Sequence, residues 1–215
     1  MFADGGYEGT YYLPYRHSAY FPLFQRVLKE VRHYSGQQVL EVGCGTGAFA
    51  HMLMDRTNLR YLGFDFSSVA IEAAKRRTNR PDAFFVADAT QADSYAAQYD
   101  TIVCTEVLEH VQHDLDIIRN WRTQVPCICS VPNFPAENHV RFFREPDEVR
   151  SRYGDLIAIE TILRIKKPEL SDISFQNYLR ALRWNRYRPQ RLAAILGLTS
   201  FNQAGGWFLF VGRRK

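Results

Sequence analysis

Two kinds of hydrophobic pattern alternate along the chain from residue 38 onward. Short runs rich in β-branched and aromatic residues predict buried strands, and amphipathic runs predict helices. The predicted strands are QVLEV (38–42), RYLGFD (60–65), AFFVAD (83–88), DTIVCT (100–105) and PCICSVP (126–132). The predicted helices between them cover residues 47–56, 67–77 and 106–122, with a poorer helical pattern over 89–98. This alternation is typical of an α/β fold, with a parallel sheet and helices on both faces.

The two ends of the chain extend this pattern. Before the first strand, Phe24, Val27, Leu28 and Val31 recur at helical spacing and predict an amphipathic helix that packs on the sheet. After the fifth strand, LIAIETILRI (156–165) and GGWFLFVGRR (205–214) are strand-like and are separated by a helical, basic stretch. Because no clean helix-length crossover joins them, we expect an antiparallel pair at one edge of the sheet.

Composition narrows the class of protein. The chain has 215 residues, a net charge of +4 and 46% hydrophobic residues, which excludes disordered, collagen-like and coiled-coil proteins and favours one domain. No apolar run approaches the roughly 20 residues of a membrane span, and the N-terminus lacks the pattern of a secretory signal. We therefore expect a cytoplasmic protein with no membrane partner. The four cysteines have no Cys-x-x-Cys spacing and are expected to be small core residues.

A glycine-rich loop is the most informative segment. In VLEVGCGTGAFA (39–50), a strand ends in Gly43, Gly45 and Gly47, and a helix follows at once. Such a turn lets the backbone approach a ligand closely and points N–H groups of the helix start at it. We expect a nucleotide-like cofactor here. The spacing from Gly43 through Gly45 to Ala48 also fits a loose dinucleotide fingerprint, so an NAD-binding or non-catalytic module is an alternative.

Acidic residues around this loop favour S-adenosylmethionine over NAD. Glu41 lies two residues before the first glycine, and Asp65 and Asp88 close the next two predicted strands. Asp65 is placed to accept hydrogen bonds from both ribose hydroxyls, and Phe66 could lie against the adenine face. Asp88 with Ala89 could bind the adenine edge. Three carboxylates at successive strand ends form a set that helix capping alone does not explain.

At this point the sequence resembles the class I S-adenosylmethionine-dependent methyltransferases. The resemblance rests on VLEVGCGTG, YLGFDFS, FFVADAT, YDTIVCTEVLEHV, SVPN and WFLFVGRR. It implies a Rossmann-like, seven-stranded, mostly parallel sheet with an antiparallel C-terminal strand, formed by residues 36–215, with an N-terminal lid and helix over 1–35. It also implies cofactor roles for Glu41, Gly43, Cys44, Gly45 and Gly47 at the methionine end, Asp65 at the ribose, Asp88 and Ala89 at the adenine, and Thr105 at the methionine amino group.

An acidic cluster follows the fourth strand. Spacings of three and four place Glu106, Glu109 and His110 on one face of the predicted helix, and oxygen ligands with a nitrogen suit Mg²⁺ or Mn²⁺. A fourth ligand is expected from His139, on the loop after the fifth strand. Two groups that the sequence resembles here use such a cluster for a divalent ion: the ubiquinone-biosynthesis O-methyltransferases and the small-RNA 3′-terminal 2′-O-methyltransferases. The alternative is that both glutamates are ordinary helix N-terminal charges.

The acceptor is a separate question. Tyr11, Tyr15 and Arg16 belong to an aromatic N-terminal segment that suits a lid over a small cyclic or anionic substrate, although such tyrosines could also simply cover the sheet edge. Asn133 and Arg141 are further candidate substrate contacts. Without a metal, His110 or His139 is the candidate general base for a hydroxyl acceptor.

A basic, aromatic stretch keeps a second class of acceptor open. Residues 180–191 contain five arginines interleaved with Trp184 and Tyr187, a composition that single-stranded RNA binding uses. A solvated helix face, or a site for a phosphate- or carboxylate-bearing small molecule, would explain the same residues. The leading hypothesis is a small-molecule methyltransferase that acts on oxygen with a divalent ion. An RNA 3′-terminal 2′-O-methyltransferase and a small-molecule N-methyltransferase are the alternatives.

Overall fold

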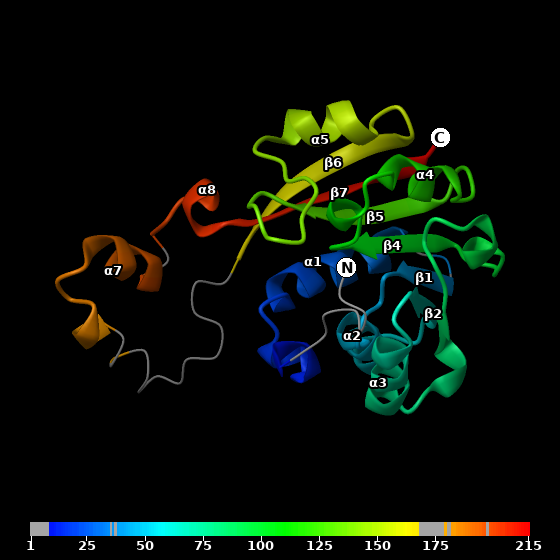
Figure 1. The fold of residues 1–215 in the computed structure, drawn as a ribbon, viewed down its shortest axis with the longest axis horizontal. Coiled ribbons are helices and arrows are strands. Elements are labelled where there is room, and N and C mark those ends of the chain that lie inside the picture. Colours follow the sequence, from blue (N-terminus) through cyan, green and yellow to red (C-terminus); the bar gives the residue numbers. More distant parts are fainter. Residues whose placement is uncertain (1–8, 35, 37, 168–178, 180–181, 197) are drawn as a thin grey trace.

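The computed structural model describes residues 9–34, 36, 38–167, 179, 182–196 and 198–215, and every structural statement below concerns these residues. Seven strands form one sheet in the order β3-β2-β1-β4-β5-β7-β6 (Figure 1). The neighbours from β3 to β5 are parallel, whereas β7 is antiparallel to both β5 and β6. The strands are β1 (Gln38–Val42), β2 (Arg60–Asp65), β3 (Phe84–Val86), β4 (Thr101–Thr105), β5 (Pro126–Pro132), β6 (Ile157–Lys166) and β7 (Gly206–Arg214).

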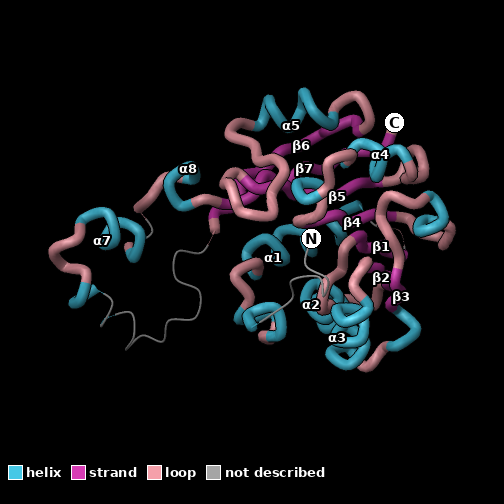
Figure 2. Tube along the Cα trace, viewed as in Figure 1, coloured by secondary structure: helices cyan, strands magenta, loops and turns pink. Residues whose placement is uncertain are grey.

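Helices cover both faces of this sheet (Figure 2). The α-helices are α1 (Phe21–Tyr34), α2 (Ala48–Arg56), α3 (Ser68–Thr78), α4 (Asp114–Arg119), α5 (Pro146–Tyr153), α7 (Pro189–Ile195) and α8 (Phe201–Ala204). The 3-10 helices are η1 (Gly9–Tyr12), η2 (Tyr15–His17), η3 (Pro81–Ala83), η4 (Ala92–Tyr95) and η5 (Leu108–His110). No described helix is both long enough and apolar enough to cross a bilayer.

The core is split into two layers by the period of two along each strand. Val39 points into the layer that α1, α2 and α3 cover, and the next residue, Leu40, points into the layer under η5, α4 and α5. Both residues are fully buried, because a parallel strand has helices on each side. This requirement explains the nearly continuous apolar runs from which the strands were predicted.

The strand order places the chemistry at one edge of the sheet. The order reverses between β1 and β4, and parallel strands all end at the same edge. A crevice opens there in sheets of this kind, and ligands bind in it. The glycine loop after β1, the turn after β2, the segment after β4 and the loop after β5 all leave from this edge.

The seven-stranded α/β fold with an antiparallel C-terminal strand is confirmed, and two helix predictions are wrong. The run from residue 106 to 122 forms not one helix but η5 and α4, separated by a turn. Its hydrophobic positions still face the core. At the break, Arg141 donates hydrogen bonds to the Leu108 and Val111 carbonyls, which would otherwise lack intrahelical partners. The poorer pattern over 89–98 forms only η4.

Candidate functional site

The loop between β1 and α2 accepts only glycine at its key positions. Gly43, Gly45 and Gly47 all have positive φ angles, of 67°, 52° and 74°. A Cβ atom on Gly43 would lie 2.3 Å from a methyl carbon of Val107, and one on Gly47 would lie 2.8 Å from the Cβ atom of Ala74. Backbone conformation favours glycine at all three positions, and close packing independently selects it at Gly43 and Gly47. The loop lies against the segment that carries the acidic cluster, which joins the two halves of the site.

Asp65, at the end of β2, holds this loop in place. One of its carboxylate oxygens accepts the Gly45 N–H at 3.0 Å, and the other accepts the Ser67 N–H at 2.9 Å. The side chain is buried, and each oxygen can accept a second hydrogen bond. Asp65 thus fixes the glycine loop to the turn that follows β2.

The other predicted cofactor residues line the same edge in different environments. Phe66 follows Asp65 directly and has an exposed ring, which is free to lie against a planar group. The Asp88 carboxylate accepts the Thr90 N–H at 2.8 Å, and the Ala89 carbonyl accepts the Tyr95 hydroxyl at 2.8 Å, so the turn after β3 is tightly held. Thr105 ends β4 and is buried.

Glu41 is a buried carboxyl beneath the glycine loop. The Tyr61 hydroxyl donates a hydrogen bond to it, and the residue is 3% exposed. Burial raises the pKa of Glu41 from 4.5 to about 8, against the hydrogen bond from Tyr61, which lowers it. Cys44, also buried, sits in the same loop and donates its backbone N–H to the Phe64 carbonyl at 2.9 Å.

Glu106 has a constrained backbone at the start of the acidic cluster. Its φ angle is 57°, in a region that residues other than glycine rarely adopt. Ser130 of β5 stabilises this conformation reciprocally: its hydroxyl accepts the Glu106 N–H at 3.2 Å and donates to the Glu106 carboxylate at 3.1 Å. Burial raises the pKa of Glu106 to about 7. The prediction that Glu106 lies on the face of a helix is wrong, because a turn with a left-handed residue orients its side chain.

Glu109, His110 and His139 come together behind this turn. One ligand atom from each lies within 4.8 Å of the others, and Glu109 is fully buried. Neither side-chain oxygen of Glu109 has a hydrogen-bond donor among the described residues. Burial, and then the negative charge of Glu106, raise the pKa of the Glu109 carboxyl well above its usual range. A shared proton or a cation would relieve this arrangement.

Both histidines present the same nitrogen to the cluster. Nδ1 of His110 is 2.9 Å from the Asn138 carbonyl, and Nδ1 of His139 is 3.2 Å from the Phe134 carbonyl. A carbonyl can only accept, so each Nδ1 carries the proton and each Nε2 keeps a lone pair. Burial lowers the pKa of both imidazoles, which favours the neutral form. Histidine metal ligands are commonly held by this type of second hydrogen bond. The residues present therefore fit a divalent ion.

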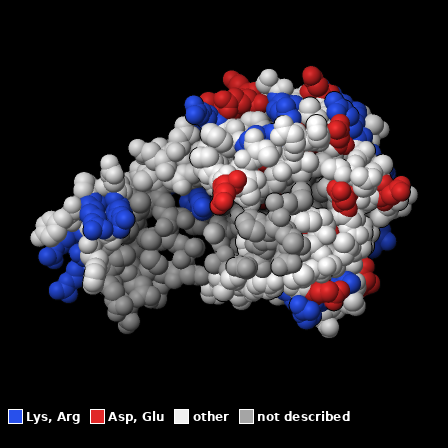
Figure 3. All heavy atoms as spheres, viewed as in Figure 1, with Lys and Arg blue, Asp and Glu red and all other residues white. Residues whose placement is uncertain are grey.

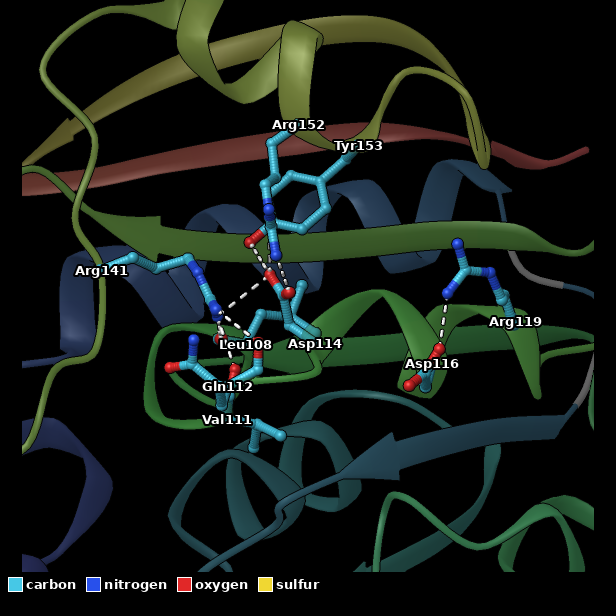
Figure 4. Close-up of polar contacts among 9 residues, drawn as sticks. All are labelled: Leu108, Val111, Gln112, Asp114, Asp116, Arg119, Arg141, Arg152 and Tyr153. Atoms are coloured by element: carbon cyan, nitrogen blue, oxygen red, sulfur yellow. Dashed lines mark hydrogen bonds and ion pairs between the residues drawn. The ribbon is translucent and has the colours of Figure 1, made fainter.

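A buried ion-pair network fixes the two loops that carry these residues (Figure 4). Asp114 is fully buried, and Arg141, Arg152 and Tyr153 all bind its carboxylate, at 3.1, 2.5 and 2.8 Å. Arg141 also donates to the carbonyls of three residues in the segment after β4, namely Leu108, Val111 and Gln112. The Val140 N–H donates to the Glu109 carbonyl at 2.8 Å. The loop after β5 is thereby bound along its length to the segment after β4.

The candidate substrate residues divide into two groups. Tyr11 lies beside the glycine loop, where its carbonyl accepts hydrogen bonds from Thr46 at 2.6 Å and Arg77 at 2.9 Å. Tyr15 is buried on α2 instead, and its hydroxyl donates to Asp55 at 3.0 Å.

Three of these candidates are occupied by other contacts. Arg16 donates to the Tyr15 hydroxyl at 3.2 Å and follows that residue away from the cluster. The guanidinium group of Arg141 is held by the Asp114 network. The side-chain oxygen of Asn133 accepts the Gly206 N–H at 2.6 Å, which ties the loop after β5 to the start of β7.

Residues that were not among the predicted site residues complete the walls of the cluster. Tyr20 packs on Trp207, with ring centroids 5.4 Å apart, and burial followed by the charge of Glu106 raises its pKa. The Lys167 ammonium lies 4.8 Å from the centre of the Phe134 ring. No local pattern singles these residues out, because four different elements contribute them. The sequence predicts only that Trp207 lies in a strand and that Phe134 follows the SVPN segment.

Comparison with known proteins is consistent with this geometry. Residues 12–148 match the family described as a methyltransferase domain. A mitochondrial ubiquinone biosynthesis O-methyltransferase from Schizosaccharomyces pombe is 26% identical over 51% of this chain and 42% of its own length. A ubiquinone biosynthesis O-methyltransferase from Vibrio campbellii is 27% identical over 65% of this chain and 57% of its own length. The chain thus spans about half the length of these curated relatives.

A solved structure extends the similarity to the fold. The N-methyltransferase NodS from Bradyrhizobium japonicum, in complex with S-adenosyl-L-homocysteine, superposes with a TM-score of 0.61 at 17% identity. The match covers 91% of this chain and 87% of NodS. The family match ends at residue 148, before β6 and β7.

The raised pKa of Glu41 predicts a specific dependence of stability on pH. Between the ordinary carboxyl pKa of 4.5 and about 8, folded Glu41 keeps a proton that the unfolded chain releases. Stability is therefore lost as the pH rises through this window, by up to about 1.4 kcal/mol per pH unit. We expect the Glu41→Gln variant to lack this loss, so that its melting temperature gains on that of the wild type from about pH 5 to about pH 8. Parallel thermal-melting profiles for the two proteins would contradict the prediction.

The Asp114 network predicts unequal effects of two similar substitutions. Arg141→Met leaves a fully buried carboxylate with fewer partners, which typically costs about 3–5 kcal/mol of unfolding free energy. Arg119→Met removes an exposed ion pair with Asp116 and should cost no more than about 1 kcal/mol. Urea unfolding of both variants measures the difference. Similar losses in the two variants would show that Arg141 is not a structural clamp.

Proposed function

The chain belongs to the S-adenosylmethionine-dependent methyltransferase family, and we propose that it methylates an oxygen of a small-molecule acceptor with the help of a divalent ion. The observation that carries this proposal is the group formed by Glu109, His110 and His139 beside the glycine loop. The Glu109 carboxylate is buried and receives no hydrogen bond from the described residues, which lowers the stability of the fold unless a proton or a bound cation compensates. Its place at the end of β4 puts it where an acceptor would meet the cofactor.

The cofactor end of the site is built from backbone and carboxylate groups. The glycine loop, including Cys44 and the Glu41 side chain beneath it, would take the methionine end. Asp65, whose carboxylate holds the Gly45 and Ser67 N–H groups, would also accept hydrogen bonds from the ribose hydroxyls. The cofactor supplies an activated methyl group when it is bound.

The remaining cofactor contacts would come from the ends of β2, β3 and β4. Phe66 would cover one face of the adenine, and the turn at Asp88 and Ala89 would bind its edge. The backbone at Thr105 would receive the methionine amino group. The protein's task is then to hold the acceptor in line with the methyl group and to exclude water.

Glu106, Glu109, His110 and His139 would hold a Mg²⁺ or Mn²⁺ ion. When bound, such an ion would lower the pKa of the hydroxyl group of the acceptor. The protein contributes the neutral Nε2 atoms of both histidines, which their carbonyl contacts select. Without a metal, the Nε2 atom of His110 or His139 would instead take the proton of the hydroxyl acceptor, which makes these residues the candidate bases.

An oxygen acceptor of low molecular mass is favoured over the alternatives. Both curated relatives compared above are ubiquinone biosynthesis O-methyltransferases. The aromatic walls formed by Tyr20, Trp207 and Phe134 suit a cyclic molecule that Tyr11 would cover. An N-methyltransferase, like NodS, would need orientation of an amine but no divalent ion. Dependence on a metal therefore separates the two reactions.

Asp65 predicts the strength of cofactor binding. We expect Asp65→Ala to weaken S-adenosylmethionine binding by about 1.5–3 kcal/mol, because a charge-assisted hydrogen bond to a hydroxyl is lost. Isothermal titration calorimetry measures this change. Asp93→Asn, an exposed carboxylate change in η4, is the matched control and should bind normally. An unchanged affinity in Asp65→Ala would refute the assignment of the ribose contact.

The metal hypothesis has a readout that does not require turnover. Titration of the apoprotein with Mn²⁺, followed by electron paramagnetic resonance, should give one tight site that Glu109→Gln weakens by about a hundredfold. Asp116→Asn, which alters an exposed carboxylate on α4, should bind Mn²⁺ like the wild type. EDTA should abolish turnover and leave the affinity for S-adenosylmethionine within a few-fold. Full turnover in EDTA, or equal Mn²⁺ binding by both variants, would remove the ion from the mechanism.

A further inference from the structure

An arm separates β6 from β7 and extends away from the sheet (Figures 1 and 2). We use "the arm" for residues 179–205, of which 180, 181 and 197 lie outside the described residues. Its end is bonded to the site edge, because the Gly205 carbonyl accepts the Lys167 N–H at 2.9 Å. The adjacent Gly206 N–H donates to the side chain of Asn133, on the loop that also carries His139. The C-terminal end of the arm is therefore attached beside the loop that carries His139.

The arm carries the entire net positive charge of the protein. It contains five arginines and no acidic residue, so the remainder of the chain, called the body below, has a net charge of −1. Its described arginines, Arg183, Arg186, Arg188 and Arg191, are exposed. In Figure 3 the visible described part of the arm shows basic and uncharged atoms only, whereas the body shows both signs. Such a separation creates a local positive field that attracts an anionic surface.

The arm also carries the most exposed large apolar side chains among the described residues. Tyr187 is 83% exposed, Trp184 is 80% exposed and Leu198 is 72% exposed. Water-facing tryptophan, tyrosine and leucine on one short segment are unusual in a soluble protein without a partner. The arm thus offers apolar groups and positive charge together.

We propose that the arm is a docking surface for an anionic lipid membrane. Interfacial segments bind bilayers by burying tryptophan and leucine at the headgroup boundary while arginines contact lipid phosphates. Both halves of this pattern are present in the arm. No described helix could cross a bilayer, but peripheral docking does not require such a helix. The prediction of no membrane partner was based on membrane spans alone.

Single-stranded RNA fits the arm less well. RNA binding uses aromatic rings for base stacking along a positively charged groove. Leu198, Leu179 and Leu196 are exposed beside the aromatic residues and give a nucleic acid nothing to bind. The body, with its net charge of −1, offers no net positive charge to extend a track from the arm to the site. A lipid surface uses the leucines as well as the arginines.

Membrane docking would also place the acceptor site beside the lipid headgroups. The arm reaches the site through Gly205 and Gly206, which contact Lys167 and Asn133. Amphipathic acceptors could then enter from the interface. This last consequence rests on the proposed function, whereas lipid binding itself does not.

Tryptophan fluorescence gives a direct test on the full chain. Trp121 and Trp207 are buried, so Trp184 is the one exposed tryptophan of the three. On addition of phosphatidylcholine vesicles that contain roughly a third phosphatidylglycerol, we expect the emission to shift to the blue and to be quenched by brominated lipid. Pure phosphatidylcholine vesicles should give a much smaller change. The Trp184→Phe variant should bind but lose the spectral shift.

Vesicle co-sedimentation separates the two contributions. The charge variant Arg183→Gln/Arg186→Gln/Arg188→Gln should lower the partition coefficient by about two orders of magnitude, since each arginine near an anionic surface contributes about a fivefold gain. The apolar variant Trp184→Ser/Tyr187→Ser/Leu198→Ser should lower it on pure and mixed vesicles alike.

The control for net charge removes three exposed arginines from the body instead. Arg76→Gln/Arg80→Gln/Arg144→Gln should retain most of the binding. Calorimetry with S-adenosylmethionine should be unchanged in all three variants, which separates this proposal from the proposed function. Equal losses in the body and arm variants, no binding to mixed vesicles, or tight binding of oligouridine without vesicle binding would each overturn the proposal.

Discussion

The buried carboxylate of Asp114 determines how the two loops of the acidic cluster meet. A fully buried charge needs an oppositely charged partner, and Arg141 forms an ion pair with Asp114. The same guanidinium group donates hydrogen bonds to carbonyl groups after β4. One guanidinium group thereby satisfies two requirements: the buried charge and the open end of a broken helix. Glu109 and His139 lie on the two segments that this group joins. The positions of the candidate ligands therefore depend on an interaction in which none of them takes part.

The fold was predictable because it depends on patterns that are local in sequence. A parallel strand is buried on both faces, so β1, β4 and β5 appear as continuous apolar runs that no surface element imitates. The tight turn after β1 was equally predictable from Gly43 and Gly47, since positive φ angles and close packing at these positions favour glycine. The antiparallel end of the sheet followed from the missing crossover between two long strand-like segments.

The site was predictable in its residue types but not in its geometry. The spacing of Glu106, Glu109 and His110 suggested a helical face, whereas the chain turns through a left-handed residue and a 3-10 helix. That turn depends on the Ser130 hydroxyl, 24 residues further along the chain, and no pattern within the segment encodes it. For the same reason Arg141 could be identified as a charged residue near the site, but its engagement with a buried aspartate could not be foreseen.

Three segments outside the regular sheet are attached to the edge where the candidate site lies. Arg77 ties the N-terminal segment to the glycine loop, the Asp114 network holds the loop after β5, and Asn133 holds the base of the arm. Each of these three segments is attached to the same edge of the sheet by a few hydrogen bonds. The strands beneath them are held by the burial of their apolar side chains. Burial thus fixes the sheet and its glycine loop, whereas the loops at its edge, where binding residues are commonly found, depend on a few polar contacts.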